Sequence, residues 1–353
     1  MIIRNQHQPL KSALEALLRP NVIRLGKNLY GVDFDTMKVI TAFYTAQRAL
    51  EMGELKEGAP IIETTSGTMG RGYAYAGRAL GIPVKLVSDP VLATPLKNEL
   101  ESLGCEVHIV QTTADNGDVQ ALRLARIYEL LEQHPGAYWG RQYDNPLNAD
   151  SYGAVAEQLV DEVGDVHCLV ATVGSGGSSG GTAKYLRKLN PKLRLIGVDT
   201  HGSVIFGQPK CSRPFRGLGN SLVPKNVRHD AFDEVHWLGA PEGYAATRIL
   251  HRRQGMFKGP TSGAAFWVAQ WYAAAHPDQV VVALLPDSGH RYADTVYNDQ
   301  WLACQGLTCK AMPIAPDTVF SPSERMVGWT RIDWKRRTLA EVLPLTSASE
   351  TMK

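Results

Sequence analysis

The chain has 353 residues, of which 44% are hydrophobic and 20% are charged, and its formal net charge is +2. This composition supports a large buried core and excludes an intrinsically disordered chain. The near-neutral charge provides no basic field for nucleic acid. We therefore expect a folded protein with no nucleic-acid partner.

The apolar runs and the cysteines indicate the cellular compartment in which we expect the protein. Residues 1–7 lack the apolar run of a secretion signal, and no segment approaches the roughly 20 apolar residues that a membrane-spanning helix needs. The longest apolar tract, residues 280–285, has the length of a strand. The five cysteines are scattered, with no CxxC motif and no nearby His or Cys pair to complete a zinc site. These features predict a cytoplasmic protein without a membrane segment or a bound metal.

Short apolar runs alternate with amphipathic stretches in the first half of the chain. Residues 60–64, 84–88 and 106–110 are predicted strands, and residues 70–80 and 93–103 are predicted helices. Because parallel strands are joined by right-handed crossovers, this order predicts three neighbouring strands of a parallel sheet.

The second half repeats this order. Residues 167–172, 194–198 and 279–285 are predicted strands, and residues 181–189 and 262–276 are predicted helices. The fold class is therefore α/β, with two lobes that carry twisted, mainly parallel sheets flanked by helices. Ligands are expected at the loops that follow the carboxyl ends of the strands.

We expect a small α/β domain, a large α/β domain and a C-terminal extension. The expected bounds are 46–147 for the small domain, 1–45 and 148–310 for the large domain, and 311–353 for the extension. From about residue 321 the sequence reads as irregular, yet its tryptophans and its Lys-Arg-Arg run predict that it docks on the rest of the chain.

A glycine-dense loop, residues 174–180 (Gly-Ser-Gly-Gly-Ser-Ser-Gly), follows a predicted strand and precedes a predicted helix. Its backbone N–H groups and the helix N-terminus suit a phosphate dianion. The dinucleotide pattern GxGxxG fails at Ser179, and Asp199 is the only acid about 20 residues further on; the Walker pattern is absent. The loop predicts a phosphate site without a nucleotide motif, and a plain tight turn is the alternative.

A second loop, residues 65–70 (Thr-Ser-Gly-Thr-Met-Gly), also joins a strand to a helix. Its hydroxyls, its backbone amides and the helix start favour a small carboxylate ligand. A hydrogen-bonded turn with a helix cap is the alternative interpretation.

Lys38 lies at an unusual place for a lysine. Apolar residues recur after it at helical spacing, and Asp35 or Thr36 is expected to cap a helix that begins near Met37. Lys38 then lies in the first turn, where the helix dipole disfavours a cation. An amine held there loses affinity for its proton and can attack an aldehyde. A solvated surface lysine is the alternative.

Ser288 follows the most apolar predicted strand, within residues 286–290 (Pro-Asp-Ser-Gly-His). A serine there either contacts a heterocyclic nitrogen or starts a turn. The amine, the phosphate loop, the carboxylate loop and this serine together fit pyridoxal 5′-phosphate, which has an aldehyde, a phosphate and a pyridine nitrogen. We therefore predict pyridoxal 5′-phosphate as the cofactor.

The chain also resembles the cysteine synthase/cystathionine β-synthase family of fold-type II pyridoxal-phosphate enzymes, from about Arg24 to Thr295. The resemblance rests on eight ordered segments, namely residues 61–70, 79–83, 103–105, 142–146, 174–180, 217–224, 259–265 and 285–292. It implies a fold like that of the tryptophan synthase β-subunit, with the active site between the lobes, and a homodimer.

The resemblance implies a role for each matching residue. Lys38 would form the Schiff base and move the α-proton, and Ser288 would contact the pyridine nitrogen. The phosphate would be bound by Gly174, Ser175, Gly176, Gly177 and Ser178. The carboxylate of the substrate would be bound by Thr65, Ser66, Gly67, Met69 and Gln142.

The chain departs from the family pattern at several positions. Thr68 stands where the family has an Asn that bonds the ring hydroxyl of the cofactor, and Met69 stands where Thr is usual.

Gly217 belongs to the loop that borders the cleft, and Arg216 or Arg71 would contact an acidic leaving group such as phosphate. A solvated arginine is the alternative at both positions.

We predict a pyridoxal-phosphate-dependent β-replacement or β-elimination on a β-substituted L-alanine, through an aminoacrylate intermediate. The substrate would be the small amino acid O-acetylserine, O-phosphoserine, serine or cysteine, and the leading interpretation is a cysteine synthase-like transferase or lyase. The alternatives are a diaminopropionate-type synthase with an amine nucleophile and a cysteine desulfhydrase. A non-catalytic binding protein of the same fold is a distant rival.

Overall fold

The computed structural model describes residues 13–65, 67–111, 119–215 and 217–343. By their internal contacts the residues divide into unit 1, Met1–Pro20 and Phe34–Gly140, and unit 2, Asn21–Asp33 and Arg141–Lys353. This division differs from the expected domain bounds, since it assigns residues 34–45, and Lys38 with them, to the smaller unit. Within the described part of the chain, no helix combines the length and the apolar character needed to cross a membrane.

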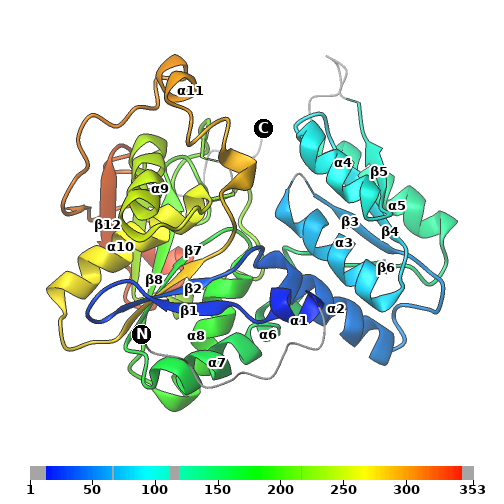
Figure 1. The fold of residues 1–353 in the computed structure, drawn as a ribbon, viewed down its shortest axis with the longest axis horizontal. Coiled ribbons are helices and arrows are strands. Elements are labelled where there is room, and N and C mark those ends of the chain that lie inside the picture. The colour runs from blue at the N-terminus through cyan, green and yellow to red at the C-terminus, as the bar shows by residue number, and fades with distance from the viewer. Residues whose placement is uncertain (1–12, 66, 112–118, 216, 344–353) are drawn as a thin grey trace. The chain divides into compact units, whose positions relative to one another are not determined.

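Unit 1 holds a four-stranded parallel sheet in the order β5-β4-β3-β6 (Figure 1). Its elements are α1 (Ala13–Leu18), α2 (Lys38–Glu51), β3 (Ile61–Thr64), α3 (Thr68–Leu80), β4 (Val84–Ser88), α4 (Thr94–Ser102), β5 (Glu106–Ile109), α5 (Val119–Gln133) and β6 (Tyr138–Trp139). The three strands and two helices predicted in this half are all present.

Both faces of this sheet are covered, because successive strand residues point to opposite sides. Ile61 packs into a cluster with residues of α2, α3 and α4, whereas its neighbour Ile62 packs with Ile127 and Leu130 of α5. Helix α2 approaches α3 closely, since a Cβ at Gly72 would lie 2.7 Å from the Lys38 carbonyl oxygen. This packing explains why Lys38 belongs to unit 1.

Unit 2 holds an eight-stranded sheet in the order β1-β2-β10-β7-β8-β9-β12-β11. Its strands are β1 (Asn21–Arg24), β2 (Leu29–Asp33), β7 (Cys168–Thr172), β8 (Arg194–Thr200), β9 (Glu234–Leu238), β10 (Val281–Leu285), β11 (Asp317–Thr318) and β12 (Trp329–Asp333). Its helices are α6 (Leu147–Asp150), α7 (Gly153–Val163), α8 (Gly177–Leu189), η1 (His229–Ala231), α9 (Ala240–Gln254), α10 (Pro260–Ala275), η2 (His290–Tyr292), α11 (Asp299–Cys304) and α12 (Leu339–Val342).

The central strands of unit 2 position the candidate site. Strands β2, β10, β7, β8 and β9 run parallel, and β7 and β10 are buried throughout, as expected for strands covered on both faces. Helix α10 packs against β10 and β7, and α8 packs against β7 and β8. Because these strands are parallel, the loops that follow their carboxyl ends meet at one edge of the sheet.

The C-terminal extension is not irregular throughout, so that expectation was wrong for residues 329–333. Strand β12 pairs antiparallel with β9, with Trp329 opposite Leu238. Trp334 is fully buried and packs edge-on against the Phe206 ring, with the two ring centroids 5.1 Å apart. The expected docking is therefore present, and it extends the main sheet of unit 2.

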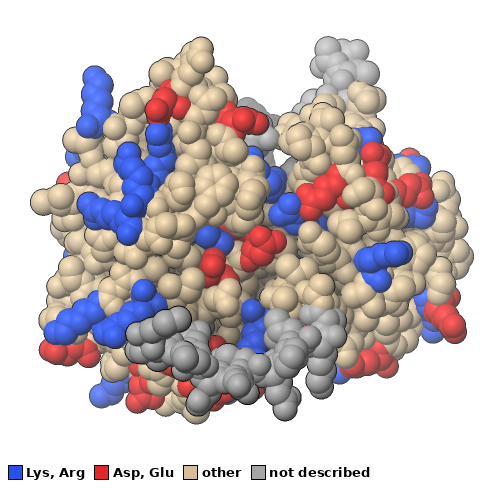
Figure 2. All heavy atoms as spheres, in the orientation of Figure 1, with Lys and Arg blue, Asp and Glu red and all other residues tan. Residues whose placement is uncertain are grey.

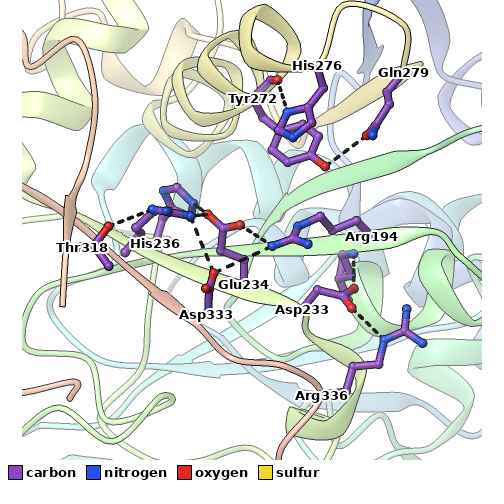
Figure 3. A network of polar contacts seen from close by, with 12 residues as sticks. Arg194, Asp233, Glu234, His236, Tyr272, His276, Gln279, Thr318, Asp333 and Arg336 are labelled. Atoms are coloured by element: carbon purple, nitrogen blue, oxygen red, sulfur yellow. Dashed lines mark hydrogen bonds and ion pairs between the residues drawn. The ribbon is translucent and has the colours of Figure 1, made fainter. Parts of the chain in front are cut away.

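A buried polar network joins β12 to β9 (Figure 3). Glu234, 1% exposed, accepts hydrogen bonds from Arg194 at 2.8 Å and from Arg331 at 2.9 Å. The Trp329 indole N–H donates to His236 Nδ1 at 2.9 Å, so His236 carries its proton on Nε2 and donates it to Glu234 at 2.7 Å. Burial lowers the pKa of His236, which agrees with this neutral tautomer.

Charges of both signs occur over each unit on the face shown in Figure 2. This agrees with the net charge of +2.

Candidate active site

The glycine loop of unit 2 has a backbone that only glycine allows at its turn. Gly176, the residue before α8, has φ +87°, and a Cβ there would lie 2.8 Å from the Asn226 carbonyl oxygen and 2.8 Å from the Val227 Cα. A Cβ at Gly177 would lie 2.0 Å from Asn148 Oδ1. The loop is thus held tightly against two neighbouring segments of unit 2.

The other side of this loop is open. A Cβ at Gly174 would meet only the Gly217 carbonyl oxygen, at 4.0 Å. The first four N–H groups of a helix have no acceptor within it and carry partial positive charge. Helix α8, with 13 residues, therefore presents N–H donors at the end that follows the glycine loop, which is the kind of position where anions bind in proteins.

The five predicted phosphate residues lie together in this loop. Gly174 and Ser178 are partly exposed, whereas Ser175, Gly176 and Gly177 are buried.

Ser288 lies at the same edge of the sheet, because β10 pairs with β7. It is partly buried, and its hydroxyl lies 3.3 Å from His290 Nδ1. The preceding Asp287 is buried and accepts hydrogen bonds from Tyr292 at 2.8 Å and from Thr261 at 3.4 Å. Burial raises the pKa of Asp287. These contacts fix the backbone on which Ser288 stands.

Lys38 is the first residue of α2 in unit 1. Met37 precedes the helix and no side chain caps it, so the expected cap by Asp35 or Thr36 was wrong. The Thr36 side chain is instead buried, and its hydroxyl has no partner among the described residues. Desolvation lowers the pKa of Lys38 to about 8, although the charge of Glu63 acts in the opposite direction. Part of this amine is therefore unprotonated near neutral pH.

Glu63 and Tyr73 are functional candidates that the sequence reasoning missed. Both are fully buried, and a Cβ at Gly140 would lie 2.7 Å from Glu63 Oε2 and 2.1 Å from the Tyr73 hydroxyl. The Tyr73 hydroxyl lies 3.0 Å from Thr45 Oγ1. The available signal was an acid inside an apolar run, Ile-Ile-Glu-Thr, in a strand with both faces covered.

The predicted carboxylate loop precedes α3 in unit 1. The Thr65 hydroxyl accepts hydrogen bonds from the N–H groups of Gly67 at 3.0 Å and Gly70 at 3.2 Å. The turn-and-cap arrangement considered as an alternative is therefore present. It aligns the backbone of the loop and occupies the lone pairs of the hydroxyl.

Three further positions of this loop differ in which of their groups a ligand could contact. Thr68 is the first residue of α3 and is partly exposed. The Met69 side chain is buried in the apolar core of unit 1, so only its backbone is available to a ligand. Ser66 lies outside the described residues.

The remaining residues predicted for substrate binding, Gln142, Gly217 and Arg216, belong to unit 2. In unit 2, the Gln142 carbonyl accepts hydrogen bonds from the side-chain amides of Asn148 at 2.8 Å and Asn226 at 3.2 Å, the residues that also contact the glycine loop. Gly217 is exposed with φ +81°, and Arg216 lies outside the described residues.

In unit 1, both Nε and Nη2 of Arg71 donate to Glu99 at 2.7 Å. The Arg71 guanidinium is thus engaged within its own unit.

An α/β fold with a glycine loop at a strand end and a lysine whose pKa is lowered by burial is typical of one class of cofactor-dependent enzyme. Residues 33–287 match the family described as "Pyridoxal-phosphate dependent enzyme", and the chain belongs to this family. It is therefore an enzyme that uses pyridoxal phosphate. The predicted family, fold class and cofactor are confirmed.

Relatives and solved structures agree with this family. The chain is 34% identical over 268 residues to N-(2-amino-2-carboxyethyl)-L-glutamate synthase of Cupriavidus metallidurans, which covers 74% of this chain and 79% of the relative. The O-acetylserine sulfhydrylase isoform 3 of Entamoeba histolytica has a similar structure, with a TM-score of 0.76, 23% identity, and coverage of 87% of this chain and 99% of that chain. The O-acetylserine-dependent cystathionine β-synthase of Helicobacter pylori has a TM-score of 0.73 and 25% identity, over 82% of this chain and 99% of that chain.

The residues present fit this cofactor. The open side of the glycine loop and the donors of α8 suit its phosphate, the partly deprotonated amine of Lys38 suits its aldehyde, and the Ser288 hydroxyl suits a ring nitrogen.

Proposed function

We propose that this enzyme joins an amine nucleophile to the β-carbon of a β-substituted L-alanine, which gives a diaminopropionate-type product. The observation that carries the proposal is the 34% identity to N-(2-amino-2-carboxyethyl)-L-glutamate synthase. That name describes a glutamate whose nitrogen carries a 2-amino-2-carboxyethyl group. The name favours the amine-nucleophile alternative over the leading cysteine synthase-like interpretation, and glutamate is the first amine to test.

The proposed chemistry divides between the cofactor and the chain. Bound pyridoxal phosphate supplies an electron sink for negative charge at the α-carbon of an amino acid. Lys38 would hold the cofactor through its amine and afterwards take the α-proton, for which a pKa of about 8 is suitable. The N–H groups at residues 174–178 would hold the phosphate, and Ser288 would donate to or accept from the ring nitrogen.

Other residues would bind the substrate. The amides of residues 65–70, aligned by the Thr65 hydroxyl, would hold its carboxylate together with Gln142. Thr68 would contact the ring hydroxyl of the cofactor, and Gly217 would border the substrate. Arg216 is proposed to contact an acidic leaving group.

The test is a product assay with purified, cofactor-loaded protein. O-acetylserine, O-phosphoserine, serine and cysteine are each supplied with glutamate or with sulfide, and products are identified by mass spectrometry. We expect a glutamate adduct with one of the four donors, and none with Lys38→Ala. Preferred formation of cysteine would contradict the amine assignment, and pyruvate as the sole product would indicate elimination. Visible absorption of bound cofactor without any turnover would indicate a binding protein.

We further propose that the enzyme is a cytoplasmic homodimer. All five cysteines are free, which suits a reducing compartment, and the dimer is what the family resemblance implies. Light scattering of the purified protein tests the dimer, and a monomeric mass would contradict it.

A further inference from the structure

Lys258 lies opposite Ser288 in a short antiparallel bridge of unit 2. The bridge has two backbone hydrogen bonds, which are donated by the N–H groups of Gly259 at 3.0 Å and of Gly289 at 2.9 Å. These bonds join the residues on either side of the pair, so Lys258 and Ser288 form a pair without mutual backbone hydrogen bonds. In such a pair the two Cα atoms lie about 4.5 Å apart and the side chains project to the same face. The Lys258 side chain is therefore the cross-strand neighbour of the Ser288 hydroxyl.

Two glycines let the paired segments approach closely. A Cβ at Gly259 would lie 2.1 Å from Asp287 Oδ1, and a Cβ at Gly289 would lie 2.9 Å from Phe257 Cδ1. Residues 257–259 and 287–289 are thus in direct contact, and a displacement of the first segment would displace the second.

The Lys258 ammonium is paired with the end of a strand. Lys258 is 5% exposed, and its Nζ lies 2.6 Å from Asp33 Oδ1. Asp33 is the last residue of β2 and lies opposite Leu285, the last residue of β10. Ser288 follows three residues after Leu285. The ion pair therefore closes a circuit of contacts that runs across the sheet, along the chain to Ser288, and back through Lys258.

The backbone of Lys258 is held from its other side by a tyrosine. The Tyr297 hydroxyl donates to the Lys258 carbonyl at 2.6 Å and accepts from the Lys258 N–H at 3.2 Å. These are the backbone groups that face away from Ser288, as in any antiparallel pair of this type. Both sides of the Lys258 backbone are thus fixed, and the ion pair fixes its side chain.

A lysine at this position has a cost in stability. A buried ammonium loses its hydration, and a carboxylate whose side chain is 23% exposed compensates for this only in part. An apolar side chain of similar length would fill the same space without that cost. The ion pair differs from an apolar contact because it specifies one partner, the end of β2.

We propose that Lys258 is a positioning residue for Ser288. Its ion pair with Asp33 fixes residues 257–259 against the end of β2, and the bridge then sets the place and direction of the Ser288 hydroxyl. The inference rests on the proposed function in one respect, because Ser288 is assigned there to the ring nitrogen of pyridoxal phosphate.

The first test follows the bridge in the apo-protein, by hydrogen–deuterium exchange of the Gly259 and Gly289 amides. In Lys258→Met, whose side chain is similar in length and uncharged, we expect both protection factors to fall about tenfold, the effect of losing one charge-assisted contact. Lys258→Arg should retain most of the protection, because the cation and its aliphatic stem remain.

A second variant covers the case in which Lys258→Met fails to fold. Lys258→Met combined with Asp33→Asn leaves no single charge buried, so it should fold, and it should show the same loss of protection. Lys192→Met, at an exposed lysine in the turn before β8, is the matched control and should behave as the wild type does. Wild-type protection in the combined variant would overturn the proposal.

Cofactor binding separates the positioning of Ser288 from a general structural role. Each apo-protein is titrated, by absorption, with pyridoxal phosphate and with its analogue in which a C–H group replaces the ring nitrogen. Lys258→Met should bind pyridoxal phosphate about fivefold more weakly and the analogue as the wild type does, because only the hydrogen bond to the nitrogen is affected. Ser288→Ala should show the same pattern, and addition of Lys258→Met to it should cause no further loss.

Equal weakening toward both ligands in Lys258→Met would assign this lysine a purely structural role and overturn the proposal. Additive losses in the double variant would do the same, as would Ser288→Ala that binds both ligands like the wild type. These titrations need no substrate. Absence of a glutamate adduct in the product assay would therefore refute the proposed function and leave the role of Lys258 intact.

Discussion

Substitution of one loop glycine tests whether the glycine loop binds phosphate. In Gly176→Ala, the left-handed backbone at φ +87° costs alanine about 1–2 kcal/mol, and the new Cβ would lie 2.8 Å from backbone atoms of Asn226 and Val227. The loop must therefore move. If two charge-assisted bonds from its N–H groups to a phosphate are lost, at about 1.5 kcal/mol each, pyridoxal phosphate binds roughly 100-fold more weakly.

Gly180→Ala is the matched control, because a Cβ at Gly180 meets nothing within 4 Å and the position lies inside α8. Alanine there should stabilise the helix by up to about 1 kcal/mol. The assay titrates each apo-protein with pyridoxal phosphate and with pyridoxal, by visible absorption. Gly176→Ala should weaken only the phosphorylated form. Equal weakening of both, or tight binding of pyridoxal phosphate by Gly176→Ala, would refute the assignment of the phosphate to this loop.

Three further predictions concern buried acids. Glu63→Gln removes the charge that raises the pKa of Lys38, so acylation of Lys38 in the apo-protein at neutral pH should become faster, as mass spectrometry would show; an unchanged rate would exclude this coupling. Glu234→Gln leaves two arginines without their buried partner and should lower the free energy of unfolding by about 3 kcal/mol in urea, whereas the half-exposed Asp333→Asn should cost under about 1 kcal/mol. The folded pKa of Asp199, about 7, lies above the ordinary 3.8, so ionisation costs stability as pH rises through this window. The melting temperature of Asp199→Asn should therefore exceed that of the wild type increasingly between about pH 4 and about pH 7, and a constant difference would contradict this.

The sequence predicted the parallel sheets well because their strands are local apolar runs. Residues 84–88 were predicted as a strand and form β4 with those bounds, and the glycine loop lies where a predicted strand gives way to a helix. Helix α8 begins at Gly177, four residues before the predicted start at 181, because packing against Asn148 overrides the low helix propensity of glycine.

Features that depend on long-range pairing were not predictable in the same way. Strand β12 is stabilised by β9, almost a hundred residues earlier, and its five residues alone do not distinguish it from a loop. From the sequence, Asp199 is recognisable only as an acid at a spacing relevant to dinucleotide binding. Its burial beneath Gly219 depends on where a distant glycine turn folds back, and this cannot be read from local sequence.

The pairing of β12 with β9 also determines where this chain can be shortened. Without residues 317–333, the outer backbone N–H and C=O groups of β9 would form an unprotected sheet margin, and such margins recruit strands from other molecules. Glu234 would at the same time lose one of its two cationic partners. A truncated version that keeps every proposed catalytic group is therefore expected to self-associate during expression. The segment that carries β11 and β12 covers this edge of the sheet, so we expect it to be needed for a soluble protein.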